Sequence, residues 1–293
     1  MKVGILGAGA WGRAIGSLLE RNGHAVSYRH HFDRDWPEGI ESLALALPVS
    51  HLRETLSRFP APGVPVLSLS KGMETGSGLR VSRIVAEAWK EERVAALSGP
   101  NFAGEIVRGL PAAAVVAAED EALAGHFQSL LHQKSFRLYR SGDLAGVELG
   151  GSLKNVYAIA AGVCRGLDLG ENAFAALVTR ALAEMTRLGL RLGGRAETFA
   201  GLSGAGDLLL TCGSAQSRNF RVGQGIAQGR SLEAIVAETG LAEGVSTTRS
   251  VAGNPAIPAE ARPIASGVAA LLFDGASPRQ VVEGLLERAV HAE

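Results

Sequence analysis

The spacing of hydrophobic positions changes near residue 140 of this 293-residue chain. Before that point, short apolar runs alternate with stretches in which apolar residues recur every three or four positions. Such short runs predict buried strands, and the wider spacing predicts amphipathic helices. Their alternation is typical of an α/β fold with a parallel, doubly wound sheet. We expect strands at 3–6, 25–28, 43–47, 64–69, 95–97, 113–117 and 136–139, with helical patterns at 51–59 and 78–92.

The segment 29–42 departs from this alternation. It reads RHHFDRDWPEGIES, contains Pro37 and Gly39, and is barely long enough for the crossover that two parallel strands require. Because a normal helix does not fit here, we expect an irregular connection.

From about residue 142 the strands stop and long helical patterns take over. The length of the chain allows two domains, so we place a boundary between residues 141 and 142 and expect the second domain to be all-α. No linker marks this boundary, which predicts a shared interface and a cleft, where ligands often bind. The predicted helices are 144–165, 173–192, 218–228, 231–239, 263–273 and 278–290.

The first strand runs directly into a glycine-rich turn that reads GAGAWG. The spacing G-x-G-x-x-G between a strand and a helix is typical of a dinucleotide-binding site. Gly7 allows the tight turn, Gly9 lets the backbone approach a pyrophosphate, and Gly12 lets the helix pack on the sheet. The helix, which we expect to stop at Gly23, then points its free N–H groups at the phosphates.

The end of the second strand affects the choice of cofactor. A carboxylate there would accept hydrogen bonds from a ribose 2′-hydroxyl, whereas basic groups suit a 2′-phosphate. The chain offers Arg29, His30 and His31, which favours NADP(H), while Asp33 leaves NAD(H) open. A solvated polar loop is the alternative.

Composition bears on partners and location. Lys plus Arg equals Asp plus Glu, 29 of each, so no overall field favours nucleic acid or a membrane surface and an anion site must be local. The chain has no apolar run of membrane-spanning length and no signal-peptide pattern, which predicts a cytoplasmic protein without membrane insertion. Cys164 and Cys212 lie far apart, so we expect buried free thiols and no metal site.

Four stretches combine glycine with polar side chains in apolar surroundings. The first two follow predicted strands, at the edge where open α/β sheets bind ligands. The four are SLSKG at 68–72, SGPNFA at 98–103, ELGGSLKN at 148–155, and GAGD at 204–207 with the following SRN at 217–219.

Three charged residues in these stretches are candidates for chemistry. Lys154 has apolar neighbours, so it either extends to solvent or is held in a cleft, where a lysine with a lowered pKa can protonate a developing alkoxide. Asp207 stands at a helix start, where capping the helix is the alternative to a chemical role. Arg218 can bind phosphate oxygens in pairs, with Ser217 and Asn219 supplying further hydrogen bonds.

In its motifs and in their order, the chain resembles bacterial NAD(P)-dependent glycerol-3-phosphate dehydrogenases over most of its length. The matching segments are GAGAWG, SKG, GPNFA, ELGGSLKNVYAIAAG, TRALAEMTRLG, GLSGAGDLLLTC, SRN and EGV. The resemblance implies a Rossmann domain at 1–141, a helical substrate-binding domain at 142–293, and reversible reduction of dihydroxyacetone phosphate to sn-glycerol 3-phosphate for phospholipid synthesis. It alone suggests a homodimer, because relatives of this kind often associate.

The resemblance also implies roles for single residues. Lys154 matches the catalytic lysine that protonates the carbonyl oxygen, Lys71 matches the lysine that contacts substrate and cofactor, and Asp207 matches the carboxylate that holds a substrate hydroxyl and orients the lysine. We add the hypothesis that the charge of Lys71 lowers the pKa of Lys154. The other expected substrate contacts are Gly99, Asn101, Ser217, Arg218 and Asn219. The expected cofactor contacts are Gly7, Gly9, Ala10, Trp11, Gly12, His31, Lys71, Ala103, Arg218, Leu241 and Glu243.

Two departures from the family pattern keep other functions open. Asn101 replaces the serine or threonine of G-P-[ST]-F-A, and the segment 32–42, which borders the adenosine end, is shortened. A related reductase of another small ketone or hydroxy acid is one alternative, which the phosphate-binding trio at 217–219 disfavours. A noncatalytic dinucleotide-binding protein is another, which the shortened segment supports and the intact Lys71, Lys154, Asp207 and Arg218 oppose.

Overall fold

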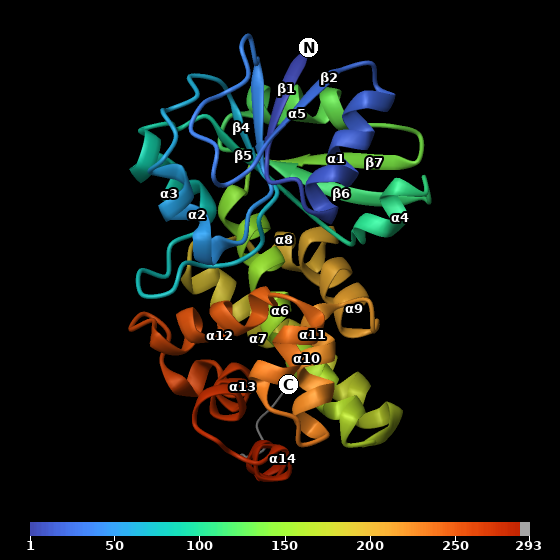
Figure 1. The fold of residues 1–293 in the computed structure, drawn as a ribbon. Helices are drawn as coiled ribbons and strands as arrows, with labels where there is room; N and C mark the ends of the chain where they lie inside the picture. Colours follow the sequence, from blue (N-terminus) through green and yellow to red (C-terminus); the bar gives the residue numbers. More distant parts are fainter. Residues whose placement is uncertain (288–293) are drawn as a thin grey trace.

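The computed structural model describes residues 1–287. A sheet with helices on both faces occupies one end of the molecule and an all-helical part occupies the other, with α6 (Leu144–Gly166) reaching from one into the other (Figure 1). Within the described part of the chain, no helix is both long and apolar enough to cross a membrane.

The seven strands form one sheet in the order β2-β1-β3-β4-β5-β6-β7. Because β2 lies on one side of β1 and β3 on the other, the strand order reverses direction at β1. Doubly wound sheets bind ligands at the carboxyl ends of the strands beside such a reversal. The doubly wound prediction is therefore confirmed. The strands are β1 (Lys2–Leu6), β2 (Ala25–Arg29), β3 (Ser42–Leu45), β4 (Val66–Ser68), β5 (Val94–Ser98), β6 (Ala112–Ala117) and β7 (Phe136–Ser141).

The expectation of a fully parallel sheet is wrong for one strand pair, because β6 runs antiparallel to β5. The connection between them contains only the five-residue helix α4 (Ala103–Val107), which is too short to carry the chain back along the sheet. The eleven-residue helix α5 (Glu121–Leu131) makes the next crossover, and β7 is again parallel to its neighbour β6.

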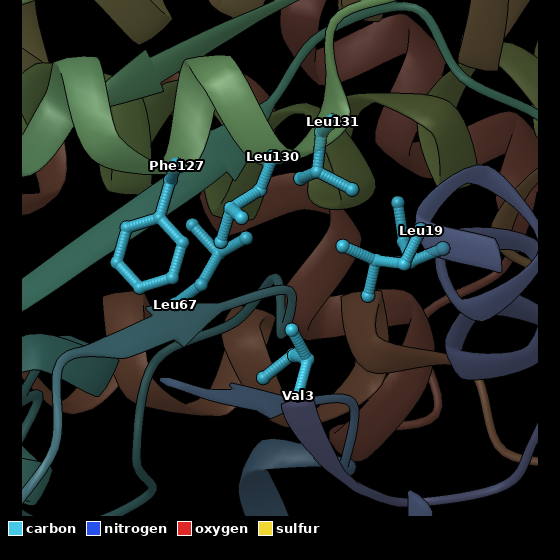
Figure 2. Close-up of a pocket in the computed structure, with 8 residues that line it drawn as sticks. Val3, Leu19, Leu67, Phe127, Leu130 and Leu131 are labelled. Carbon is cyan, nitrogen blue, oxygen red and sulfur yellow. The ribbon is translucent and has the colours of Figure 1, made fainter. Parts of the chain in front are cut away.

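Apolar side chains from both faces of the sheet form its cores. α1 (Ala10–Arg21) and α5 pack on one face, and α2 (Val49–Leu56) and α3 (Val81–Trp89) pack on the other. A cavity of about 10 Å³ remains beneath α1 and α5, lined by apolar side chains such as Val3, Leu67 and Phe127 (Figure 2). Its size and lining exclude it as a site for a cofactor or a phosphorylated substrate.

The segment between β2 and β3 contains no helix, as predicted. Trp36 anchors it: the indole nitrogen donates to the carbonyl oxygen of Pro60 at 2.8 Å, and the ring stacks on Phe59 and meets Trp89 edge-on. An aromatic anchor thus replaces the usual crossover helix on this face of the sheet.

The second half of the chain is helical throughout the described residues. The predicted helices agree with the structure to within three residues, except that the end of the helix predicted at 278–290 lies outside the described residues. Cys164 and Cys212 are buried free thiols, as predicted. The remaining helices are α7 (Gly170–Arg191), α8 (Ala196–Ala200), the π-helix η1 (Leu202–Gly206), α9 (Asp207–Cys212), α10 (Arg218–Ala227), α11 (Leu232–Thr239), α12 (Glu243–Gly253), the 3-10 helix η2 (Ala259–Ala261), α13 (Pro263–Phe273) and α14 (Pro278–Leu286).

α6 belongs to the packing of both parts. Its first turns pack on β5 and β6 through Leu144 and Val147, and the rest of the helix lies in the core of the helical part. α10 crosses α6 at backbone contact, since a methyl group on Gly223 would lie 1.9 Å from the carbonyl oxygen of Ile159. The boundary between residues 141 and 142 stays a prediction, because α6 is shared by the two parts.

Candidate active site

Lys154 is held inside the protein rather than extended to solvent. Its side chain is 8% exposed, and its ammonium group contacts Oδ1 of Asp207 and donates to Oγ1 of Thr211 at 2.8 Å. Thr211 stands one helical turn after Asp207 in α9, so both groups reach the lysine from the same helix. Lys154 is therefore buried among these side chains and does not extend to solvent.

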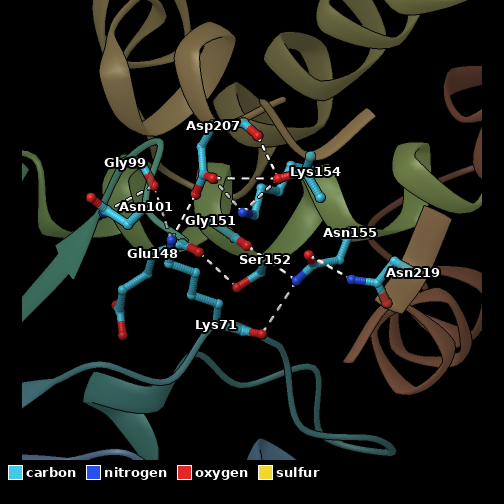
Figure 3. A network of polar contacts seen from close by, with 11 residues as sticks. Lys71, Gly99, Asn101, Glu148, Gly151, Ser152, Lys154, Asn155, Asp207 and Asn219 are labelled. Carbon is cyan, nitrogen blue, oxygen red and sulfur yellow. Dashed lines mark hydrogen bonds and ion pairs between the residues drawn. The ribbon is translucent and has the colours of Figure 1, made fainter. Parts of the chain in front are cut away.

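The second lysine meets the same carboxylate from the other side (Figure 3). Nζ of Lys71 donates to Oδ2 of Asp207 at 2.7 Å and to the carbonyl oxygen of Gly99 at 3.1 Å. Lys71 follows β4, Gly99 follows β5, and Lys154 lies on α6, so the carboxyl edge of the sheet and the helical part meet at Asp207. One fully buried carboxylate thus holds two ammonium groups in place.

The position of Asp207 excludes the capping alternative. Gly206 occupies the N-cap of α9, and Asp207 already has helical backbone angles. The preceding glycine-rich segment is the π-helix η1. Wider π-turns often occur at functional sites.

Burial lowers the pKa of Lys154 from its ordinary value to about 8. The negative charge of Asp207 acts in the opposite direction, and the positive charge of Lys71 lowers the pKa further, as we hypothesised. A lysine with a pKa of about 8 exchanges its proton near neutral pH, which suits a general acid or base.

Asn101 turns back on its own loop. Its Nδ2 donates to the carbonyl oxygen of Gly99 at 3.0 Å, and its buried Oδ1 has no hydrogen-bond partner within residues 1–287. The carbonyl oxygen of Gly99 therefore accepts from both Asn101 and Lys71.

The trio at 217–219 forms the N-terminus of α10. Ser217 caps the helix by accepting from the N–H of Phe220, and Arg218 is exposed at the first helical position. Asn219 is buried and donates from Nδ2 to Oδ1 of Asn155 at 2.8 Å, which joins α10 to α6 one residue beyond Lys154. The helix N-terminus and the Arg218 guanidinium can bind a phosphate group.

The turn between β1 and α1 fits a dinucleotide. Gly7 has φ +108, a conformation that favours glycine, and a methyl group on Gly12 would lie 2.0 Å from the carbonyl oxygen of Gly7. A methyl group on Gly9 would meet no other atom of residues 1–287 within 4 Å. Packing within the protein accounts for Gly7 and Gly12, whereas the space beside Gly9 suits the approach of a ligand.

A second group of expected cofactor contacts lies around Glu243, at the start of α12. Its Oε1 accepts from the N–H of Val49 at 3.1 Å, and its buried Oε2 has no partner within the described residues. Burial raises the pKa of Glu243 to about 7, against the positive charge of Arg218. An unpartnered buried oxygen fits a hydroxyl donor such as a ribose.

The structure does not bring every expected cofactor contact into one cluster. His31 lies in the loop after β2, where its exposed ring meets Phe32 edge-on. Ala103 opens α4, Leu241 is 37% exposed just before α12, and Ala10 and Trp11 form the first turn of α1.

Both parts of the chain match one family of proteins. Residues 35–124 match the model of the NAD-dependent glycerol-3-phosphate dehydrogenase N-terminus, and residues 143–283 match that of its C-terminus. The chain belongs to the NAD-dependent glycerol-3-phosphate dehydrogenase family.

Individual members of the family are similar over nearly the whole chain. Glycerol-3-phosphate dehydrogenase [NAD(P)+] of Paucimonas lemoignei is 42% identical, covering 98% of this chain and 97% of the relative. The protein of the same name from Synechococcus sp. (strain JA-2-3B'a(2-13)) is 45% identical, covering 99% and 95%. The crystal structure of glycerol-3-phosphate dehydrogenase from Coxiella burnetii is 33% identical and superimposes with a TM-score of 0.89, covering 98% of this chain and 99% of that one.

Sequence reasoning missed several residues that contact the expected site. Thr211 was detectable from its spacing, because it stands four residues after Asp207 in a helix. Asn155 stands next to Lys154, but only the fold shows that it binds Asn219. Within residues 1–287, no group of three His, Cys, Asp or Glu side chains is placed to hold a metal ion.

Proposed function

We propose that this chain is an NAD(P)-dependent dehydrogenase that reversibly reduces dihydroxyacetone phosphate to sn-glycerol 3-phosphate. The observation that carries the proposal is the buried Asp207 between Lys71 and Lys154, at the carboxyl edge of the sheet. The bond from Asn219 to Asn155 joins the N-terminus of α10 to the helix that carries Lys154. The names of the relatives support this substrate and this cofactor.

The protein residues supply the proton and the positioning. Bound NAD(P)H supplies the hydride that goes to the substrate carbonyl carbon. Nζ of Lys154 gives its proton to the carbonyl oxygen, which becomes the product hydroxyl, and the reverse reaction returns that proton to the neutral amine. Asp207 orients Lys154, and the Lys71 ammonium adds positive charge where negative charge develops on the oxygen.

The substrate phosphate is assigned to the start of α10. The Ser217 hydroxyl accepts from the N–H of Phe220, which leaves its own proton free to donate, and Arg218 contributes a paired donor. A reductase of a substrate without phosphate would have no use for this arrangement.

Arg218→Ala tests the phosphate assignment. We expect the Michaelis constant for dihydroxyacetone phosphate to rise about 10- to 100-fold, because hydrogen bonds between charged groups are lost, with a smaller change in kcat. Arg230→Ala in the same part of the chain removes an exposed pair with Glu238 and serves as the matched control. An unchanged Michaelis constant in Arg218→Ala contradicts the assignment.

NADP(H) is the proposed preferred cofactor. One oxygen of the Asp33 carboxylate accepts from the backbone N–H of His30 at 2.8 Å, so it is committed to its own loop. Arg29 lies beside the glycine turn, since its carbonyl oxygen accepts from the N–H of Gly7, and its guanidinium is partly used by Asp35. His30 and His31 are exposed in this loop and can meet a 2′-phosphate.

The decisive experiment is an assay of the purified protein with dihydroxyacetone phosphate, following oxidation of NADPH and NADH in parallel. Turnover is expected with both, and faster at low concentration with NADPH. The same assay with an unphosphorylated ketone should show little turnover. Folded protein that turns over neither cofactor would contradict the proposal and favour the noncatalytic alternative, with the shortened 32–42 segment as its cause.

From the sequence and the resemblance, we also propose a cytoplasmic location, a homodimer and a role in phospholipid synthesis.

A further inference from the structure

The loop that carries Lys71 is held by side chains of the helical part of the chain. Ser152 on α6 donates from Oγ to the carbonyl oxygen of Gly72 at 3.0 Å, and Ser250 on α12 donates to the carbonyl oxygen of Met73, also at 3.0 Å. Both serines are buried. Two successive carbonyl groups after Lys71 are thus bound by hydroxyl groups from two different helices.

Other contacts fix the loop on either side of these serines. A methyl group on Gly72 would lie 2.9 Å from Oε2 of Glu243, so the loop fits tightly against the start of α12. At its far end, the loop is closed by an isolated antiparallel β-bridge between Met73 and Arg80. The Glu148 carboxylate on α6 accepts from the Arg80 guanidinium and from the N–H and hydroxyl of Ser82. The α6 helix that carries Lys154 therefore also forms hydrogen bonds to both ends of the Lys71 loop.

Each serine has a second acceptor for its single proton. The Ser152 hydroxyl also lies 2.7 Å from the carbonyl oxygen of Glu148, and that of Ser250 lies 3.1 Å from the carbonyl oxygen of Ser246, one turn earlier in its own helix. A hydroxyl donates one proton at a time, so each can bind the loop or its own helix. The loop contacts can therefore be exchanged without leaving a buried hydroxyl unpaired.

We propose that Ser152 and Ser250 are positioning residues that set Lys71 against Asp207 and Lys154 by holding the carbonyl groups of Gly72 and Met73. This inference rests on the proposed function, because it assigns Lys71 to that reaction. Neither serine forms a hydrogen bond with the side chains of the two lysines or the aspartate. Their effect on turnover would be exerted through the loop.

Ser152→Ala, Ser250→Ala and the double variant test this inference. Each single variant should lower kcat/KM for reduction about fivefold, and the double variant about 25-fold, as expected for the loss of one and two neutral hydrogen bonds. Because the Lys71 charge lowers the pKa of Lys154, displacing Lys71 should raise that pKa and move the high-pH limb of kcat/KM to higher pH. Thr186→Val is the matched control, since its hydroxyl donates to the carbonyl oxygen of Leu182 in its own helix.

Hydrogen exchange, measured by mass spectrometry without substrate, tests whether the two serines hold the Lys71 loop, independently of activity. Amide exchange across residues 70–81 should rise about fivefold in each single variant and leave the other segments unchanged. Unchanged exchange in this segment overturns the inference. So does faster exchange there with wild-type kcat/KM and pH profile, or a rise spread over the whole chain. If the wild-type protein shows no turnover, the proposed function fails, and the exchange data alone decide whether the serines hold the loop.

Discussion

Lys154→Ala is expected to lower kcat for dihydroxyacetone phosphate reduction by about two to four orders of magnitude, the usual contribution of a positioned general acid. The side chain is buried, and its ammonium group contacts Asp207 and Thr211. Alanine removes the proton donor and leaves Asp207 paired with Lys71. Steady-state kinetics with NADPH would measure the loss.

Cofactor affinity separates a catalytic loss from a folding defect in this variant. Lys154 is not among the contacts expected for the dinucleotide, so the dissociation constant for NADPH, measured by fluorescence titration, should change less than threefold. Lys134→Ala, at an exposed lysine, should retain wild-type turnover. Near-normal kcat in folded Lys154→Ala contradicts the role assigned to Lys154.

Asp207→Asn is expected to reduce kcat/KM for reduction by roughly 100-fold. The amide has nearly the same shape, but it removes the negative charge that the buried Lys154 and the partly buried Lys71 share. An opposite charge at this distance shifts a pKa by about one to three units, so its loss lowers the pKa of Lys154 further and leaves less of the protonated acid at neutral pH.

The pH dependence of kcat/KM should shift in a definite direction in this variant. Reduction needs protonated Lys154, so kcat/KM should be high below the pKa of about 8 and fall as the pH rises through it. In Asp207→Asn this limb should move to lower pH, the direction opposite to that expected for the serine variants. Oxidation of glycerol 3-phosphate needs the neutral amine and should rise through the same pH range.

Two outcomes would count against the role of Asp207. One is an unmoved pH limb in a folded Asp207→Asn protein, and the other is a kcat/KM within twofold of the wild type. A thermal melt checks folding, because loss of one partner from a buried ion pair costs about 3–5 kcal/mol of stability. Asp143→Asn is the matched control: its carboxylate is also buried, but it caps α6 and accepts from the backbone N–H of Arg195 and the hydroxyl of Thr198.

The sequence determined the parts of the protein that depend on local patterns. Apolar spacing located the strands and most of the long helices, and the order of strand, G-x-G-x-x-G and helix predicted the nucleotide turn. The motifs also pointed to the three charged residues that the structure brings together. Each of these signals lies within about twenty residues of chain, where backbone periodicity and turn chemistry act directly.

How these parts meet depends on contacts between segments that are far apart in the chain. Lys71 and Asp207 are 136 residues apart, and Ser250 and Met73 are 177 apart, so no local pattern reports their contacts. The antiparallel β6 follows from the length of a connection measured against the sheet, and the lowered pKa of Lys154 follows from burial among side chains of several elements. Local patterns fix which residues are polar or apolar, whereas the distances between distant charges depend on how the helices and the sheet pack together.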